Sequence, residues 1–340
     1  MHPSCHAFVL FAALLSAQAM LWAEAIPQRR IHPELGLPLA CSIGRTCWIA
    51  NYVDVISSKQ ARDFSCGPRS YDGHDGVDFA IRDLGVMAQG VPVLASAAGT
   101  VRGVRDGMID APVTDQAARQ RIAGKECGNG VVIDHADGWQ TQYCHLRKGS
   151  VHVKPGESVS EGTPLGMVGL SGQTEFPHLH FTVRSKGENV DPFSGLPANA
   201  GCATAGQSLW RNSDAFRYEP VALYNAGLSV GAPDIAAIRA GLHGDGPFPV
   251  SAASLVLWVD IFGVQAGDRI RFLLAASDGQ AVLDSEVVVE KTQARRFIYV
   301  GAKRTAQDWV RGSYAGEVVL SRKHEGEVLR RAIKTTTRLQ

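Results

Sequence analysis

The stretch 130–145, GVVIDHADGWQTQYCH, decides how the central part of this chain folds. Its apolar and β-branched residues flank the turn-forming triplet at 136–138, so the sequence predicts two antiparallel strands joined by a short turn. Similar short apolar runs, interrupted by Gly and Pro, extend on both sides from about residue 51 to about residue 195. We therefore expect a mainly β chain with an antiparallel sheet at its centre.

The C-terminal part of the chain predicts a second β domain. Residues 246–340 contain six short apolar runs and no helical pattern, with runs at 255–262, 269–275, 282–289, 297–300, 314–320 and 328–333. Such spacing favours a β-sandwich of immunoglobulin-like type. The expected division is a signal peptide at 1–25, a lead-in at 26–50, a sheet domain at 51–200, a connector at 201–245 and the immunoglobulin-like domain at 246–340.

The N-terminal region predicts an exported protein. Residues 8–19 form an apolar run that is too short to span a bilayer but suits the core of a signal peptide. Small residues that fit a cleavage site follow at 17–19 and 23–25. No later stretch is apolar enough for a membrane span, and a net charge of +1 gives no reason to expect a nucleic-acid partner. We expect a soluble exported protein, periplasmic in the first place and secreted as the alternative.

Six cysteines remain after removal of the predicted signal peptide, which contains Cys5. An even number of cysteines in an exported chain predicts a set of disulfides, here three. Local geometry favours the pairs Cys41–Cys47, Cys127–Cys144 and, by what then remains, Cys66–Cys202. The other pairings stay open at the level of sequence. A zinc–thiolate site is disfavoured because no two cysteines have Cys-x2-Cys spacing.

Histidine and aspartate recur in a pattern that suits one zinc ion. His74 and Asp78 stand in a Gly-containing loop that leads into a predicted strand, and His178 and His180 alternate on another. Residues i and i+2 of a strand share one face, about 6.6 Å apart, so both imidazoles of the pair point the same way. A catalytic zinc takes three protein ligands and a water. His74, Asp78 and one histidine of the pair supply such a set.

The remaining histidines then divide into two groups. The other histidine of the strand pair and His145, on the predicted hairpin, would lie beside a zinc-activated water and handle its proton. His135, near the hairpin turn, is interpreted as a structural residue.

The region from about Cys41 to Cys202 resembles the M23 family of zinc metallopeptidases, the LytM or lysostaphin type. The matching motifs are HDGVD at 74–78, GVPV at 90–93, GTV at 99–101, GNGVVIDH at 128–135, YCHL at 143–146, KPG at 154–156, GTPLG at 162–166 and HLHF at 178–181. The resemblance implies an antiparallel β groove with one zinc per chain. It assigns zinc binding to His74, Asp78 and His180, catalysis to His145 and His178, and hydrolysis to peptide bonds of peptidoglycan stem or cross-link peptides.

Two features depart from the family pattern. Phe176 stands where the family usually has glycine before Pro-His-Leu-His, so we expect a reshaped groove wall. A polar insertion at 106–125 is expected to border the groove and to limit the peptides that enter it. Two other functions are kept as alternatives, a binding module that activates a cell-wall amidase and a secreted protease for Gly-rich proteins. All five polar positions are present, which favours the endopeptidase, and no partner is predicted for the C-terminal domain.

Overall fold

The computed structural model describes Met1 and residues 32–305, 307–324 and 326–340. Apart from Met1, the predicted signal peptide at 1–25 therefore lies outside the described residues. Residues 32–340 form one compact unit, and strands make up most of its regular structure. The prediction of a mainly β chain is confirmed.

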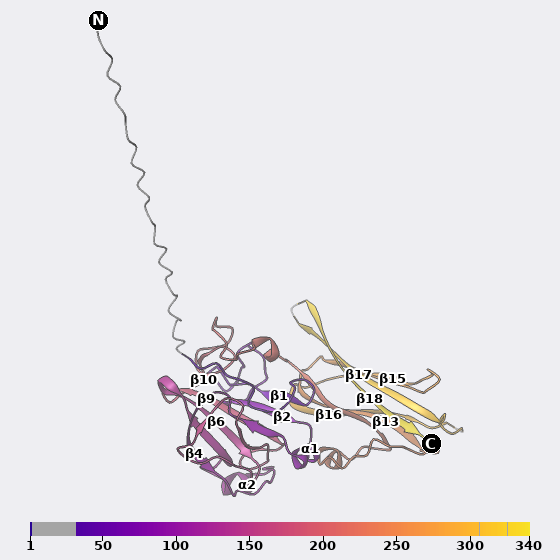
Figure 1. The fold of residues 1–340 in the computed structure, drawn as a ribbon. Helices are drawn as coiled ribbons and strands as arrows, with labels where there is room; N and C mark the ends of the chain where they lie inside the picture. The colour runs from indigo at the N-terminus through magenta and orange to yellow at the C-terminus, as the bar shows by residue number, and fades with distance from the viewer. Residues whose placement is uncertain (2–31, 306, 325) are drawn as a thin grey trace. The chain divides into compact units, whose positions relative to one another are not determined.

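An antiparallel sheet occupies the region in which the motifs were found (Figure 1). Its strands lie in the order β1 (Cys47–Asn51), β2 (Val77–Ile81), β9 (His178–Ser185), β6 (Trp139–Leu146), β5 (Asn129–Asp134), β4 (Gly99–Arg105) and β7 (Ser158–Val159), and β10 (Glu188–Asp191) extends from β9 to β11 (Leu196–Pro197). The hairpin predicted at 130–145 is β5 and β6, which pair Val131 with Tyr143. Its turn contains Asp137 at φ 57° and Gly138 at φ 80°, left-handed conformations that Asp and Gly tolerate best.

Strand alternation separates a core face of this sheet from a face that is free for polar groups. In β9, Leu179, Phe181 and Val183 are buried in the hydrophobic core. Because successive side chains of a strand point to opposite faces, His178 and His180 lie on the other face. A small two-stranded sheet of β3 (Pro92–Leu94) and β8 (Pro164–Met167) and the short helix α1 (Leu84–Gln89) complete this part of the fold.

The insertion at 106–125 is hydrogen-bonded to the segment that follows β6 and to the segment that precedes β9. It contains the short helix α2 (Gln116–Arg121), whose cap residue Asp115 accepts a hydrogen bond from the backbone N–H of Ala118. Asp110 accepts backbone N–H groups from Lys148 and Leu170 at 3.0 and 2.8 Å. The insertion therefore lies against the segment that leads into β9.

The C-terminal part consists of two antiparallel sheets that share one core. One sheet has the order β12 (Ala222–Val230), β13 (Ser254–Val264), β16 (Gln293–Lys303), and the other β15 (Ala281–Val288), β14 (Arg269–Ala275), β17 (Gly312–His324), β18 (Glu327–Leu339). Each of the six predicted runs falls on one of these strands. Buried Leu257, Phe272 and Leu320 contribute to the core from β13, β14 and β17. The more specific immunoglobulin-like type stays a prediction.

Part of the segment 201–245, which we expected to be a connector, is a strand. β12 pairs with β13 over eight register positions from Ala222–Phe262 to Val230–Leu255, so it belongs to the C-terminal sheet. Its Asn and Gly residues weaken the strand pattern, and pairing with the long buried strand β13 overrides that weak local preference. The same segment also holds the 3-10 turn at Ser213–Phe216 and the short helix α3 (Ile235–Arg239).

In the part of the chain that the structure describes, three disulfides join Cys41 to Cys47, Cys66 to Cys202 and Cys127 to Cys144. These are the three pairs that local geometry favoured. Within the described residues, the structure contains no helix that is long and apolar enough to cross a membrane.

Candidate metal centre

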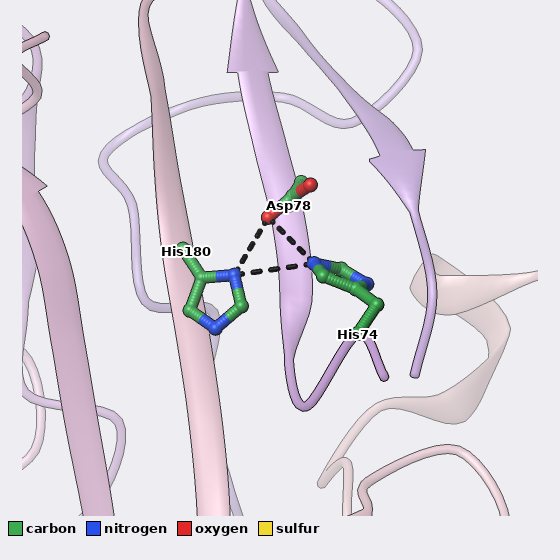
Figure 2. Close-up of side chains that lie close together, drawn as sticks. All are labelled: His74, Asp78 and His180. Atoms are coloured by element: carbon green, nitrogen blue, oxygen red, sulfur yellow. Dashed lines mark hydrogen bonds and ion pairs between the residues drawn. The ribbon is translucent and has the colours of Figure 1, made fainter. Parts of the chain in front are cut away.

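Three side chains from three segments bring one atom each to a common point (Figure 2). His74 lies in the loop before β2, Asp78 lies on β2, and His180 lies opposite Asp78 in the pairing of β2 with β9. His74 Nε2 is 3.1 Å from Asp78 Oδ1 and 3.2 Å from His180 Nδ1, and His180 Nδ1 is 2.9 Å from Asp78 Oδ1. Donors bonded to one tetrahedral zinc at about 2.0–2.1 Å lie about 3.3 Å apart. The triangle therefore has nearly the size that a zinc ion requires.

The other polar atoms of these residues are held by neighbours. His74 Nδ1 lies 2.7 Å from the carbonyl oxygen of Tyr52, and His180 Nε2 lies 3.0 Å from Asp75 Oδ1. Each acceptor holds a ring N–H, so in the neutral ring the lone pair lies on the nitrogen that faces the common point. Asn51 Nδ2 donates to Asp78 Oδ2 at 2.8 Å, which leaves Oδ1 directed inward.

A glycine makes room for this arrangement. A Cβ atom on Gly76 would stand 2.6 Å from His180 Nε2 and 2.7 Å from the carbonyl oxygen of Phe181. Since real Cβ contacts of this length essentially do not occur, any side chain at Gly76 would displace His180 or the backbone of β9. The glycine of the HDGVD motif therefore has a steric reason that the sequence pattern alone did not supply.

The ionisation of Asp78 and His180 follows from their burial and from the charges and hydrogen bonds of their neighbours. Burial by itself would raise the pKa of Asp78, but His74 and His178 beside it outweigh burial and hold this pKa well below its usual range. Burial would lower the pKa of His180, yet its hydrogen bonds to Asp75 and Asp78 raise it to about 9. The carboxylate is thus ionised and surrounded by nitrogen donors, which is the donor chemistry that zinc prefers.

Two further histidines lie next to the triangle. His178 Nε2 is 3.3 Å from Asp78 Oδ1, and the ring centroids of His145 and His178 are 4.7 Å apart. His145 Nδ1 is 2.8 Å from the carbonyl oxygen of Ser171, and His178 Nδ1 is 2.9 Å from that of Phe176. His145 therefore keeps Nε2 as its free nitrogen, whereas Nε2 of His178 faces the carboxylate of Asp78. Burial, followed by the charges of His178 and His180, lowers the pKa of His145 well below its usual value.

The backbone at His145 is unusual. His145 has φ 64°, a left-handed conformation that a non-glycine residue adopts only when its surroundings impose it. Its N–H donates to the carbonyl oxygen of Cys127 at 2.8 Å, next to the Cys127–Cys144 disulfide. The strain is thus located at one of the two histidines that the family resemblance assigned to catalysis.

A groove of about 370 Å³ borders this cluster, and His145 and His180 are part of its lining. Residues of the sheet and of the neighbouring loops line it, and most of them are polar. Among them are Tyr71, Asp75, Gln142, His145, His180 and Arg184. Glu126 and Gln173 also line it, and Gln173 N donates to the carbonyl oxygen of Glu126 at 2.7 Å. Glu126 directly follows the insertion, but no residue of 106–125 is in the groove lining, so a role of the insertion in peptide choice stays a prediction.

The structure brings all five predicted site residues into one cluster and leaves His135 outside it. His135 hydrogen-bonds to the carbonyl oxygen of Ala98 at 2.7 Å and to Thr141 Oγ1 at 2.9 Å. Sequence reasoning did not single out Asp75, Asn51 or Tyr52, which support the triangle from outside. Asp75 lies inside the HDGVD motif, whereas the contacts of Asn51 and Tyr52 depend on the pairing of β1 with β2 and carry no sequence signal.

Comparison with known proteins identifies the region around this cluster. Residues 72–192 match peptidase family M23, and the match includes all five site residues. Cell division protein DipM of Caulobacter vibrioides is 37% identical over 118 residues, which are 32% of this chain and 16% of DipM. The DD-carboxypeptidase/endopeptidase Mpg of Neisseria meningitidis serogroup B is 34% identical over 123 residues, 36% of this chain and 22% of Mpg. Peptidoglycan DD-endopeptidase ShyA of Vibrio cholerae is 32% identical over 132 residues, 39% of this chain and 24% of ShyA.

These matches confirm the resemblance that the motifs indicated. They are confined to one region, because the shared segment spans less than a quarter of the length of each of these three relatives.

Proposed function

We propose that this chain, whose residues 72–192 form a peptidase family M23 domain, is a zinc metalloendopeptidase that hydrolyses peptide bonds in peptidoglycan stem or cross-link peptides. The observation that carries the proposal is the convergence of His74 Nε2, Asp78 Oδ1 and His180 Nδ1 within 4.8 Å of one another, beside a groove whose lining includes His180 and His145. One zinc ion per chain is expected there. When bound, zinc supplies Lewis-acid chemistry, by which it activates a water and polarises a peptide carbonyl.

The chain's own residues supply the proton transfer. His145 and His178 each have Nδ1 next to a backbone carbonyl, at 2.8 and 2.9 Å, so that Nε2 is the nitrogen left for proton transfer. In His178 this nitrogen also lies 3.3 Å from Asp78 Oδ1. One of these histidines can accept the proton of the attacking water, and a protonated histidine can then donate it to the leaving amine. His74, Asp78 and His180 act as metal ligands, and the groove orients the peptide.

The proposed substrate and location follow from the relatives. ShyA is named as a peptidoglycan DD-endopeptidase and Mpg as a DD-carboxypeptidase/endopeptidase, and their similarity to this chain supports peptidoglycan peptides as the substrate class here. Three disulfides are consistent with an oxidising compartment, so we propose an exported protein, in the periplasm rather than released. Neither a nucleic acid nor a partner for the C-terminal sheets is part of the proposal.

Digestion of purified peptidoglycan by the zinc-loaded mature protein tests this function. We expect soluble muropeptides whose masses correspond to cleaved cross-link or stem peptides, with loss of release after chelation and recovery on adding zinc. His74→Ala provides the inactive control. Two other results would overturn the proposal. If the protein alone releases no muropeptides but increases their release by an added amidase, it is an activating module. If it cleaves Gly-rich proteins and leaves peptidoglycan intact, it is a secreted protease.

A further inference from the structure

The loop before β9 fixes the ring of His178 through the backbone of Phe176. His178 Nδ1 is 2.9 Å from the Phe176 carbonyl oxygen and 3.0 Å from Thr174 Oγ1. Thr174 Oγ1 in turn donates to the same carbonyl at 2.7 Å. The ring of Phe176 also lies against the imidazole of His178, with centroids 4.7 Å apart. The position of Phe176 therefore decides the position and the tautomer of His178.

The side chain of Phe176 is held by the C-terminal sheets. Its ring is 5.3 Å from the ring of Phe262 on β13, and the guanidinium carbon of Arg295 on β16 lies 5.5 Å from its centroid. Phe262 and Arg295 are register partners in the pairing of β13 with β16. A side chain from the loop of the candidate site thus packs on a platform made by the other part of the fold.

The platform itself is rigid. Phe262 is 2% exposed and stacks on Tyr224 of β12 with centroids 4.3 Å apart. Arg295 donates to the Tyr224 hydroxyl and, at 2.9 Å, to Asp260 Oδ2, and the buried carboxylate of Asp260 also pairs with Arg239 at 2.9 Å. Packing and charge-assisted hydrogen bonds therefore leave the platform little freedom to move.

We propose that the C-terminal sheets belong to the catalytic apparatus, because they hold the proton-handling His178 in place through Phe176. Phe176, Phe262 and Arg295 act as positioning residues, and the peptidase region needs the C-terminal sheets for full turnover. A glycine at 176, as in the usual family pattern, would have no ring to carry this link. The inference rests on the proposed function, since it assigns to His178 a role in proton transfer.

Kinetic measurements on the full-length mature protein test the link. Phe176→Ala and Phe262→Ala should each lower kcat about 10- to 100-fold, because misplacement of a catalytic group by about 1 Å has an effect of that order. KM and bound zinc should stay close to the wild-type values. The kcat of the double variant Phe176→Ala/Phe262→Ala should be no lower than that of the slower single variant, since both substitutions interrupt the same link. Phe176→Tyr, which keeps the ring, should retain most of the activity.

Ile298→Ala provides the matched control. Like Phe262, Ile298 is a buried core residue; it lies on β16 and is 8% exposed. It is not part of the aromatic cluster around Phe176. It should lower stability without lowering kcat. If Phe262→Ala and Ile298→Ala have the same kcat, or if Phe176→Ala raises KM alone, the link does not exist.

A second measurement separates this inference from the proposed function. The Nδ1–H signal of His178, assigned by its loss in His178→Ala, should be visible by nitrogen-15 NMR of histidine-labelled protein. It should broaden or disappear in Phe262→Ala and persist in Ile298→Ala. If wild-type protein cleaves no peptide but the signal behaves in this way, the proposed function fails and the structural link stands. An unchanged signal in Phe262→Ala overturns the link.

Discussion

At the scale of single residues, the site divides the strand pair His178 and His180 between two tasks. His180 Nδ1 belongs to the triangle with His74 and Asp78, whereas His178 Nε2 is 3.3 Å from Asp78 and its Nδ1 is held by the backbone. The two side chains come from the same strand face, so a metal ion at the triangle would bind His180, the nearer one, and would leave His178 for proton transfer. Family resemblance implied the same division.

This division predicts different losses on substitution. His180→Ala should lose zinc affinity and activity together because it removes a ligand. His178→Ala and His145→Ala should keep zinc and lose about 10²–10⁴ in kcat, the usual contribution of a positioned acid–base group. Metal analysis after gel filtration, combined with peptide hydrolysis, checks both statements. Zinc lost from His178→Ala and retained by His180→Ala would reverse the assignment.

A second prediction concerns Asp191, which is buried at the end of β10 and is not part of the groove lining. Burial raises its pKa to about 6, although Ser194 and the backbone N–H of Phe193 donate to it. Because the folded pKa exceeds the unfolded one, the folded protein binds the additional proton between about pH 4 and 6. This proton stabilises the folded state by on the order of 3 kcal/mol. The stabilisation is fully present below the unfolded pKa and is lost as the pH rises through about 6.

Chemical unfolding of Asp191→Asn between pH 4 and 7 tests this sign. The difference in unfolding free energy between variant and wild type should shift in favour of the variant as the pH rises. Asp214→Asn, at an exposed carboxylate, should show no such trend. A difference that is constant with pH would show that Asp191 titrates normally.

At the scale of elements, the Cys127–Cys144 disulfide ties the start of the hairpin to the strand that carries His145. Cys144 precedes His145 in β6, and the N–H of His145 donates to the carbonyl oxygen of Cys127 at 2.8 Å. His145, whose backbone is left-handed at φ 64°, is thus held by the disulfide on the residue before it and by the hydrogen bond of its own N–H. The disulfide therefore holds both the hairpin and the strained residue.

Replacing this disulfide by Cys127→Ser/Cys144→Ser should cost about 2–4 kcal/mol of stability. It should also lower kcat about 10- to 100-fold, because the strained backbone can relax and move His145. The matched control is Cys41→Ser/Cys47→Ser, which removes a disulfide of sequence separation 6 outside the groove lining. Denaturation and kinetics of both variants would be compared at a temperature where each is folded. Equal kcat in the two variants would contradict a role of the first disulfide in positioning His145.

At the scale of the whole molecule, a buried arginine joins the peptidase sheet to the C-terminal sheets. Arg69 is 1% exposed, and its Nε donates to the carbonyl oxygen of Ala50 at 3.0 Å. Its Nη1 reaches the carbonyl oxygens of Glu219 and Phe262, each at 3.3 Å. Gly263, at φ 75°, makes room for it, since a Cβ there would stand 2.3 Å from Arg69 Cδ. Residues 32–340 accordingly form one compact unit.

We expect wild-type protein to unfold in one cooperative transition and Arg69→Met to lose about 3–5 kcal/mol. The loss follows because several buried carbonyl groups would lose a charged donor. Differential scanning calorimetry should show the transition of the variant splitting into two as the two parts uncouple. Arg62→Met, in the same loop but with a partly exposed side chain, should change stability by less than about 0.5 kcal/mol. Two transitions in the wild-type protein would contradict the coupling.

Much of this protein was determined by the sequence itself. The hairpin and the strand runs of both β parts follow from local patterns, because alternation and turn chemistry act over a few residues. The choice of His74, Asp78, His145, His178 and His180 as site residues followed from the donor chemistry of zinc and from the motifs. The motif spacing added the M23 resemblance. Strand β12 was not predicted, since its Asn and Gly residues form a strand only when β13 is available as a partner.

The tertiary structure alone decided what supports the site from outside. The carbonyl of Tyr52, the amide of Asn51 and the ring of Phe262 reach the ligand and proton-handling residues across 22, 27 and 86 positions of sequence, the last measured from Phe176. Contacts between residues so far apart depend on strand register and on the packing of one sheet against another. No local period or spacing encodes such packing, and the link between the C-terminal sheets and His178 therefore becomes visible only in the folded chain.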